Sequence, residues 1–152
     1  MKKILFFFAL ITLTQISCNS DDVSDNDIPI NINLEINQQN LLGKWFLKGG
    51  TINGGSFESH QHKCTSLKDY QEFLSDNNIN FVEYDVNCEI VDAETSGYYL
   101  EGNKLTIVSF DPVVSQDYVY TIISITQQEL ILKQTANTPD GVETYEIYFT
   151  RN

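Results

Sequence analysis

From Leu41 to the end of the chain, short runs of apolar residues alternate with polar ones at a period of two, and clusters of turn-forming residues separate the runs. A two-residue period is typical of strands with one buried face, and no stretch shows a helical period over more than a turn or two. The sequence therefore predicts eight strands, which are Gly43–Gly49, Leu67–Leu74, Ile79–Ile90, Thr95–Glu101, Lys104–Phe110, Asp117–Ile125, Glu129–Gln134 and Glu143–Thr150.

The segments between these runs carry turn signals at short intervals. They are Asp76-Asn77-Asn78, Gly102-Asn103, Asp111-Pro112, Gln127-Gln128 and Thr138-Pro139-Asp140-Gly141. Eight short strands joined in this way predict an all-β meander that forms a barrel or a sandwich.

Two hairpins allow the register to be predicted, because a two-residue loop determines which residues face one another. A Gly102-Asn103 loop pairs Glu101 with Lys104, Leu100 with Leu105 and Tyr98 with Ile107, which places apolar pairs on one face. A Gln127-Gln128 loop pairs Ile125 with Leu130 and Ile123 with Leu132 in the same way.

The N-terminus follows a different pattern. Met1-Lys2-Lys3 is basic, and an apolar run of about ten residues follows from Ile4 to Leu13. This run is much shorter than the roughly 20 residues of a membrane-spanning helix. We therefore interpret residues 1–17 as a signal peptide and exclude them from the fold.

The signal ends at Ile16-Ser17-Cys18, which resembles the lipobox of bacterial lipoproteins, although Gln15 departs from the aliphatic residue usual there. The resemblance implies that Cys18 is the lipidated N-terminus, held at the outer membrane by its acyl chains. Ser20-Asp21-Asp22 resembles the acidic signal that directs some lipoproteins to the cell surface; the periplasmic face is the alternative. An ordinary structural cysteine is the alternative role for Cys18.

Residues 18–40 are expected to form an acidic tether, rich in Asp, Asn and Ser, ahead of a folded domain at residues 41–152. Within the tether, Ile28, Ile30, Ile32, Leu34 and Ile36 alternate with polar residues and Pro29. This pattern fits an edge strand or an extended arm laid on the barrel, and an unstructured spacer remains open.

Charge and motifs exclude several functions. The formal net charge is −12, or −14 once Lys2 and Lys3 leave with the signal, and Arg151 is the only arginine. Nucleic acid is therefore not an expected partner. No catalytic triad, nucleophile motif or phosphate loop is present, so we expect neither an enzyme nor a cofactor. The alternating acids Glu83, Asp85 and Glu89 read as a solvated strand face.

Once Cys18 is assigned to lipid, Cys64 and Cys88 remain as an even pair in an oxidising compartment. A disulfide between them would close a loop of about 25 residues and add roughly 3 kcal/mol of stability. Two free thiols are the alternative.

Gly43-Lys44-Trp45 opens the first predicted strand, and Phe149-Thr150-Arg151 ends the last one. Together with eight strands and the segment GYYLEGNKLTI, these residues resemble a lipocalin, and more closely the lipocalin-like lipoproteins of Gram-negative bacteria. The resemblance covers about residues 38–152. It implies an eight-stranded antiparallel up-and-down barrel, a short helical turn at residues 37–42, and Arg151 stacked on Trp45 at the closed end.

The resemblance also implies a monomeric carrier that binds one small hydrophobic ligand inside the barrel. The side chains expected along the ligand wall are Tyr84, Tyr98, Ile107, Ile123, Leu132, Tyr145 and Ile147. Eight strands enclose a space that side chains can fill or that holds one small ligand. The alternative is therefore a packed, ligand-free barrel that serves as a surface interaction module.

His60-Gln61-His62-Lys63-Cys64 is the one cluster that resembles a metal site. Alternate residues of an extended segment share a face, so the two imidazoles lie within reach of one ion. No neighbouring carboxylate motif completes a ligand set and Lys63 adds repulsion, so we expect no metal. Together with Gly54-Gly55, these residues instead predict a long polar loop, residues 50–66, over the mouth of the barrel.

Overall fold

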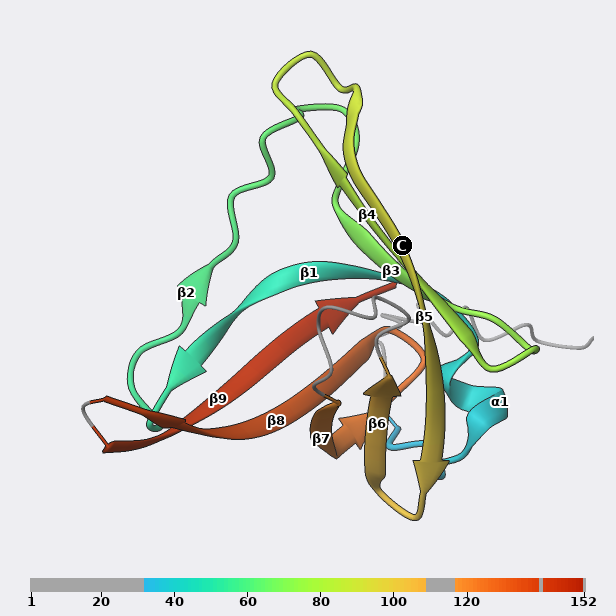
Figure 1. Cartoon of the computed structure of the whole chain (residues 1–152), viewed down its shortest axis with the longest axis vertical. Coiled ribbons are helices and arrows are strands. Elements are labelled where there is room, and N and C mark those ends of the chain that lie inside the picture. The colour runs from blue at the N-terminus through green and yellow to red at the C-terminus, as the bar shows by residue number, and fades with distance from the viewer. Residues whose placement is uncertain (1–31, 109–116, 140, 152) are drawn as a thin grey trace, which may run out of the picture.

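The computed structural model describes residues 32–108, 117–139 and 141–151, and it shows a closed antiparallel β-barrel (Figure 1). Eight strands form the barrel, and a ninth, β2, is a two-residue addition at its edge. The strands are β1 (Gly43–Ile52), β2 (Glu58–Ser59), β3 (Tyr70–Phe73), β4 (Asn78–Tyr84), β5 (Ile90–Glu101), β6 (Lys104–Val108), β7 (Tyr118–Ile125), β8 (Glu129–Thr138) and β9 (Gly141–Thr150).

The strand order shows how the barrel closes. Each strand from β3 to β9 pairs with the next, and β1 pairs with β3 along its first half and with β9 along its second. The predicted eight-stranded up-and-down barrel is therefore confirmed, and the sandwich alternative is wrong. Closure satisfies the backbone groups that an open sheet would leave unpaired at its edges.

The first predicted hairpin register is confirmed and the second is half right. Glu101 pairs with Lys104 and Tyr98 with Ile107 across the turn at Gly102, whose φ of 60° suits glycine. Beyond the second turn Ile125 does pair with Leu130, as predicted. The register then shifts at a bulge, so that Ile122 rather than Ile123 faces Leu132.

The predicted strand Ile79–Ile90 is wrong beyond Tyr84. The Asp85 carboxylate accepts hydrogen bonds from the amides of Asn87 and Glu89, at 2.8 and 2.9 Å, which turns the chain.

Strand β5 starts five residues earlier than predicted, at Ile90, and β3 starts only at Tyr70. Strands β1, β8 and β9 are longer than predicted, and the Asp111-Pro112 turn lies outside the described residues.

The chain ahead of the barrel crosses one end of it. Residues 32–36 form no strand, but the Leu34 amide donates to the Ile125 carbonyl at 2.7 Å, and Leu34 and Ile36 pack against the core. The described part of the tether is thus an arm laid on the barrel. The predicted helical turn follows as α1 (Gln38–Leu41), capped by the Asn37 side chain.

Apolar side chains fill the end of the barrel beside α1. This core contains Leu41, Trp45, Phe73, Ile79, Tyr98, Leu105, Ile107, Ile122, Ile125, Leu130, Leu132 and Phe149. Figure 1 shows α1 near this end, whereas the β4–β5 and β8–β9 hairpins project away from it. None of the described residues belongs to a helix long and apolar enough to span a membrane.

Candidate functional site

Trp45 and Arg151 close one end of the barrel, as predicted. The Arg151 guanidinium carbon lies 3.9 Å from the centre of the Trp45 ring, and Trp45 has no exposed surface. Arg151 also donates hydrogen bonds to the carbonyls of Asn40 and Leu42, at 2.6 and 2.9 Å, and the indole donates to the Leu41 carbonyl at 2.8 Å. One cation therefore binds the first strand, the last strand and α1 together.

Tyr98 belongs to the same closed end. Its ring meets Phe73 edge-on at 5.0 Å, and its hydroxyl donates to the Leu74 carbonyl at 2.9 Å. Burial raises the pKa of Tyr98, and the hydrogen bond from Gln38 opposes that rise. The hydroxyl of Tyr98 is therefore engaged in hydrogen bonds within the closed end.

The opposite half of the barrel contains a cavity of about 340 Å³. Leu47, Phe81, Tyr120 and Ile147 line it and pack against the core, yet each keeps part of its surface exposed. Side chains that touch the core but stay accessible mark a space that the protein leaves unfilled. The barrel is therefore packed at its closed end and hollow toward its mouth. The prediction of an interior that holds a ligand and the alternative of a fully packed interior each describe one half of it.

A few polar groups also line this cavity. Gln71 is 6% exposed, and its side-chain Nε2 has no acceptor among the described residues. A buried donor without a partner costs about 1–3 kcal/mol, so an acceptor brought by a bound molecule would be stabilising here. Burial, and to a smaller extent Tyr118, raise the pKa of Tyr120, whose hydroxyl therefore remains protonated at neutral pH.

Three carboxylates stand at the rim of the same cavity: Asp69, Glu83 and Asp92. Glu83 and Asp92 are directly opposite each other in the β4–β5 pairing. Such a rim repels anions, and it admits neutral or cationic molecules more readily.

A second cavity, of about 480 Å³, lies between the end of β1 and the loop that follows it. Its walls include Ile52, Ser59, His60, Tyr145 and Ile147. A β-carbon on Gly49 would overlap the Glu58 carbonyl oxygen, so only glycine lets β2 approach β1 this closely.

The loop over the mouth is confirmed in part. Residues 50–52 still belong to β1, and residues 53–69 run from the β8–β9 side of the barrel to the β4–β5 tip, with β2 on the way (Figure 1). The predicted disulfide is present, since Cys64 and Cys88 are bonded and tie this loop to the β4–β5 turn. His60 and His62 lie in the loop, as expected.

The seven side chains predicted along the ligand wall divide into three groups. Ile147 lines both cavities and Tyr145 lines the larger one. Tyr98, Ile107 and Leu132 are buried in the closed-end core. Ile123, expected inside, is 48% exposed on the outer face because of the bulge, and Tyr84 is out of phase with Ile79 and Phe81 and lines neither cavity.

Of the residues that line the smaller cavity, only Ile147 is among the side chains predicted along the ligand wall. The residues not predicted include Leu47, Gln71, Phe81 and Tyr120. Strand parity contained the signal for three of them, because Leu47 is two residues from Trp45, Gln71 two from Phe73 and Phe81 two from Ile79. Which end of the barrel is hollow depends on the packing of all eight strands.

Comparisons with known proteins agree with this architecture. A family model described as the lipocalin-like domain matches residues 41–132. A lipocalin-like protein from Bacteroides uniformis ATCC 8492 has a TM-score of 0.55 at 14% identity, over 74% of this chain and 99% of that one. Lobster apocrustacyanin A1 has a TM-score of 0.50 at 14% identity, over 76% of this chain and 63% of that one. No curated protein sequence matches the chain.

Proposed function

The chain belongs to the lipocalin-like domain family, and we propose that it is a binding protein, not an enzyme, which holds one small hydrophobic molecule in its barrel. The observation that carries this proposal is the cavity of about 340 Å³ among Leu47, Phe81, Tyr120 and Ile147. Ligand pockets in proteins have volumes of about 300–1,000 Å³, with apolar walls and a few polar groups that orient the ligand.

The polar groups restrict the class of ligand. The unpartnered donor of Gln71 fits a carbonyl or hydroxyl oxygen, which would be bound where the protein offers no acceptor among its described residues. The carboxylates Asp69 and Asp92 disfavour an anionic head group at the mouth, whereas the charge of Glu83 is balanced by Lys63. We therefore expect a neutral amphiphile, such as a retinoid alcohol, to bind more tightly than a fatty acid of similar size.

A cavity-filling substitution tests the carrier proposal. Ile147→Trp places an indole in the cavity, and we expect the affinity for retinol to fall at least tenfold, or about 1.4 kcal/mol. Displacement of a fluorescent probe, with a chelator present to remove metal ions, measures the affinity of the full chain for retinol and for a fatty acid.

The matched control is Ile123→Trp, since Ile123 is the same residue type on the outer face of the barrel. This variant should bind like the unaltered protein. If no ligand class binds saturably, the interaction module with a ligand-free barrel becomes the better account. If both variants bind equally well, the ligand does not occupy this cavity, and the same alternative is favoured.

We further propose that the protein is a lipoprotein, attached to the outer membrane through Cys18 and facing the cell surface or the periplasm. The support is the signal-like segment 1–17, the lipobox-like Ile16-Ser17-Cys18 and the acidic residues that follow, all outside the described residues.

We also propose a monomer, because β1 pairs with β9 and so leaves no long strand edge among the described residues for pairing with another copy.

Substitution of Cys18 tests the anchor. In Cys18→Ser the thiol that forms the thioether is absent, so we expect loss of radioactive palmitate labelling and release of the protein from the membrane fraction. Cys18 has no part in the Cys64–Cys88 disulfide, and the barrel should remain folded. Palmitate labelling of the Ser variant at the original level would disprove lipidation at this residue.

A further inference from the structure

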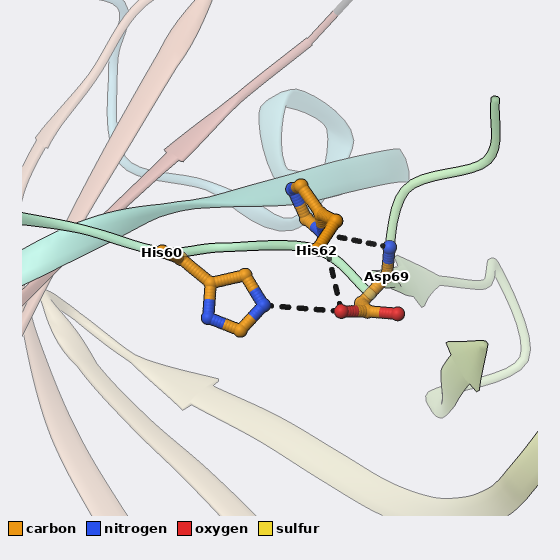
Figure 2. A group of neighbouring side chains, drawn as sticks. All are labelled: His60, His62 and Asp69. Carbon is orange, nitrogen blue, oxygen red and sulfur yellow. Dashed lines mark hydrogen bonds and ion pairs between the residues drawn. The ribbon is translucent and has the colours of Figure 1, made fainter. Parts of the chain in front are cut away.

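Three side chains from the loop ahead of β3 converge on one another (Figure 2). His60 Nε2 lies 3.0 Å and His62 Nδ1 lies 3.1 Å from the same carboxylate oxygen, Asp69 Oδ2. The two imidazole rings are perpendicular, with their centres 4.7 Å apart. The fold thus supplies the carboxylate that the sequence around the histidines lacks, because Asp69 comes from the end of the same loop, next to β3.

We propose that His60, His62 and Asp69 form a zinc-binding site at the mouth of the barrel. The proposal does not require a ligand in the cavity, although Asp69 belongs to both sites. Two imidazole nitrogens and one carboxylate oxygen, with a fourth position left to water, are a common donor set for zinc.

The geometry is close to that of a bound ion. The three ligand atoms lie within 4.8 Å of one another. Zinc bonds of about 2.0–2.2 Å in a tetrahedron place neighbouring ligand atoms about 3.3 Å apart. The distances of 3.0 and 3.1 Å need to widen by a few tenths of an ångström, and the two imidazole nitrogens need to approach each other by up to about 1.5 Å. Rotation of the half-buried imidazoles supplies both changes.

Each ligand is held in place by the fold. The His60 amide donates to the Lys48 carbonyl at 2.9 Å, which attaches the loop to β1. The disulfide fixes Cys64, two residues after His62. The second oxygen of Asp69 accepts a hydrogen bond from the Tyr84 amide at 2.9 Å, and this bond turns Oδ2 toward the histidines.

The polypeptide alone does not satisfy His62 Nδ1. This nitrogen accepts the Asp69 amide at 3.0 Å, so it carries no proton, and yet it also lies 3.1 Å from Asp69 Oδ2, another acceptor. A cation between the nitrogen and the oxygen replaces this repulsive contact with two bonds. The nitrogen has one lone pair, so the Asp69 amide must then release its hydrogen bond to His62.

The surrounding charges favour a cation. Burial raises the pKa of Asp69, but hydrogen bonds from His60 and from the Tyr84 amide outweigh this effect, and the pKa lies below its usual value. Asp69 is therefore a carboxylate at neutral pH. Lys63, whose charge in the sequence counts against a metal, is paired with Glu83 at 3.2 Å.

Titration of the full chain with zinc, followed by calorimetry, tests the proposal. The protein should carry no polyhistidine tag. We expect one zinc ion per chain and a rise in melting temperature in excess zinc, because a ligand that binds only the folded state stabilises it. In His60→Gln and Asp69→Asn the affinity should fall at least about 100-fold, since even residues that only support metal ligands contribute 10–100-fold.

Two measurements separate a metal site from a structural cluster. Asp92→Asn, which removes a nearby charge but no ligand, should change the affinity much less than Asp69→Asn. In NMR spectra, zinc should shift the ring signals of both histidines and speed hydrogen exchange at the Asp69 amide. Unaltered affinity in His60→Gln, or zinc binding without changes at the two rings, would overturn the proposal, and His60→Gln decides the matter even if Asp69→Asn fails to fold.

Discussion

Replacing Trp45 by alanine should lower the free energy of unfolding by about 4 kcal/mol, the largest effect that we expect from a single substitution in this chain. Trp45 is completely buried, so its removal leaves a cavity at the closed end. The Arg151 guanidinium also loses the ring on which it lies. A domain of this size typically has about 5–15 kcal/mol of stability, so this loss is a large fraction of the total.

Urea denaturation followed by far-UV circular dichroism measures this effect, because Trp45 is the only tryptophan and cannot report on its own removal. Ile123→Ala is the control, since this side chain is exposed and its loss should change stability by less than about 0.5 kcal/mol. Equal losses in the two variants would contradict the assignment of Trp45 to the core.

A double-mutant cycle isolates the contact between the two residues. Trp45→Phe and Arg151→Met, made singly and together, should give an interaction energy of about 0.5–2 kcal/mol, as expected for a guanidinium on an indole. Purely additive losses would mean that Arg151 acts through its hydrogen bonds to Asn40 and Leu42 alone.

Removal of the disulfide should have the second largest effect. In the variant with both Cys64→Ser and Cys88→Ser, the free energy of unfolding should fall by about 3 kcal/mol. The two cysteines are 24 positions apart, and their bond restricts the unfolded chain as well as tying the loop over the mouth to the β4–β5 turn.

The same urea experiment on the double variant and on the reduced unaltered protein measures this loss. Both samples should lose similar stability, because both lack the same covalent bond. The disulfide lies at the turn of the β4–β5 hairpin, which projects away from the closed end (Figure 1), so the β-structure there should persist in the folded state of each. A change of less than about 1 kcal/mol in both samples would show that the loop is held by its other contacts.

The sequence predicted much of the barrel because neighbouring residues specify its turns and strands. The Gly102-Asn103 turn determines its hairpin register through glycine's access to positive φ. Pattern alone does not show where strands break, and the predicted strand Ile79–Ile90 therefore crosses the Asp85 turn. The Ile123 error has a similar origin, because a bulge leaves the apolar pattern Ile122-Ile123 unchanged while it reverses which residue faces inward.

The candidate sites differ in the same way, because some depend on local sequence and others on how the whole chain packs. The sequence by itself determined the strand pattern and favoured a Cys64–Cys88 disulfide over two free thiols, because alternation and an even pair of cysteines are local signals. The contact of Arg151 with Trp45 was implied by the resemblance to lipocalins, and the structure shows it. Only the tertiary structure decided that the mouth half is hollow, since an unfilled volume depends on how all the strands pack. Only the tertiary structure brought Asp69 to the two histidines, because a loop can return to its starting point in space without any sign in the spacing of its residues.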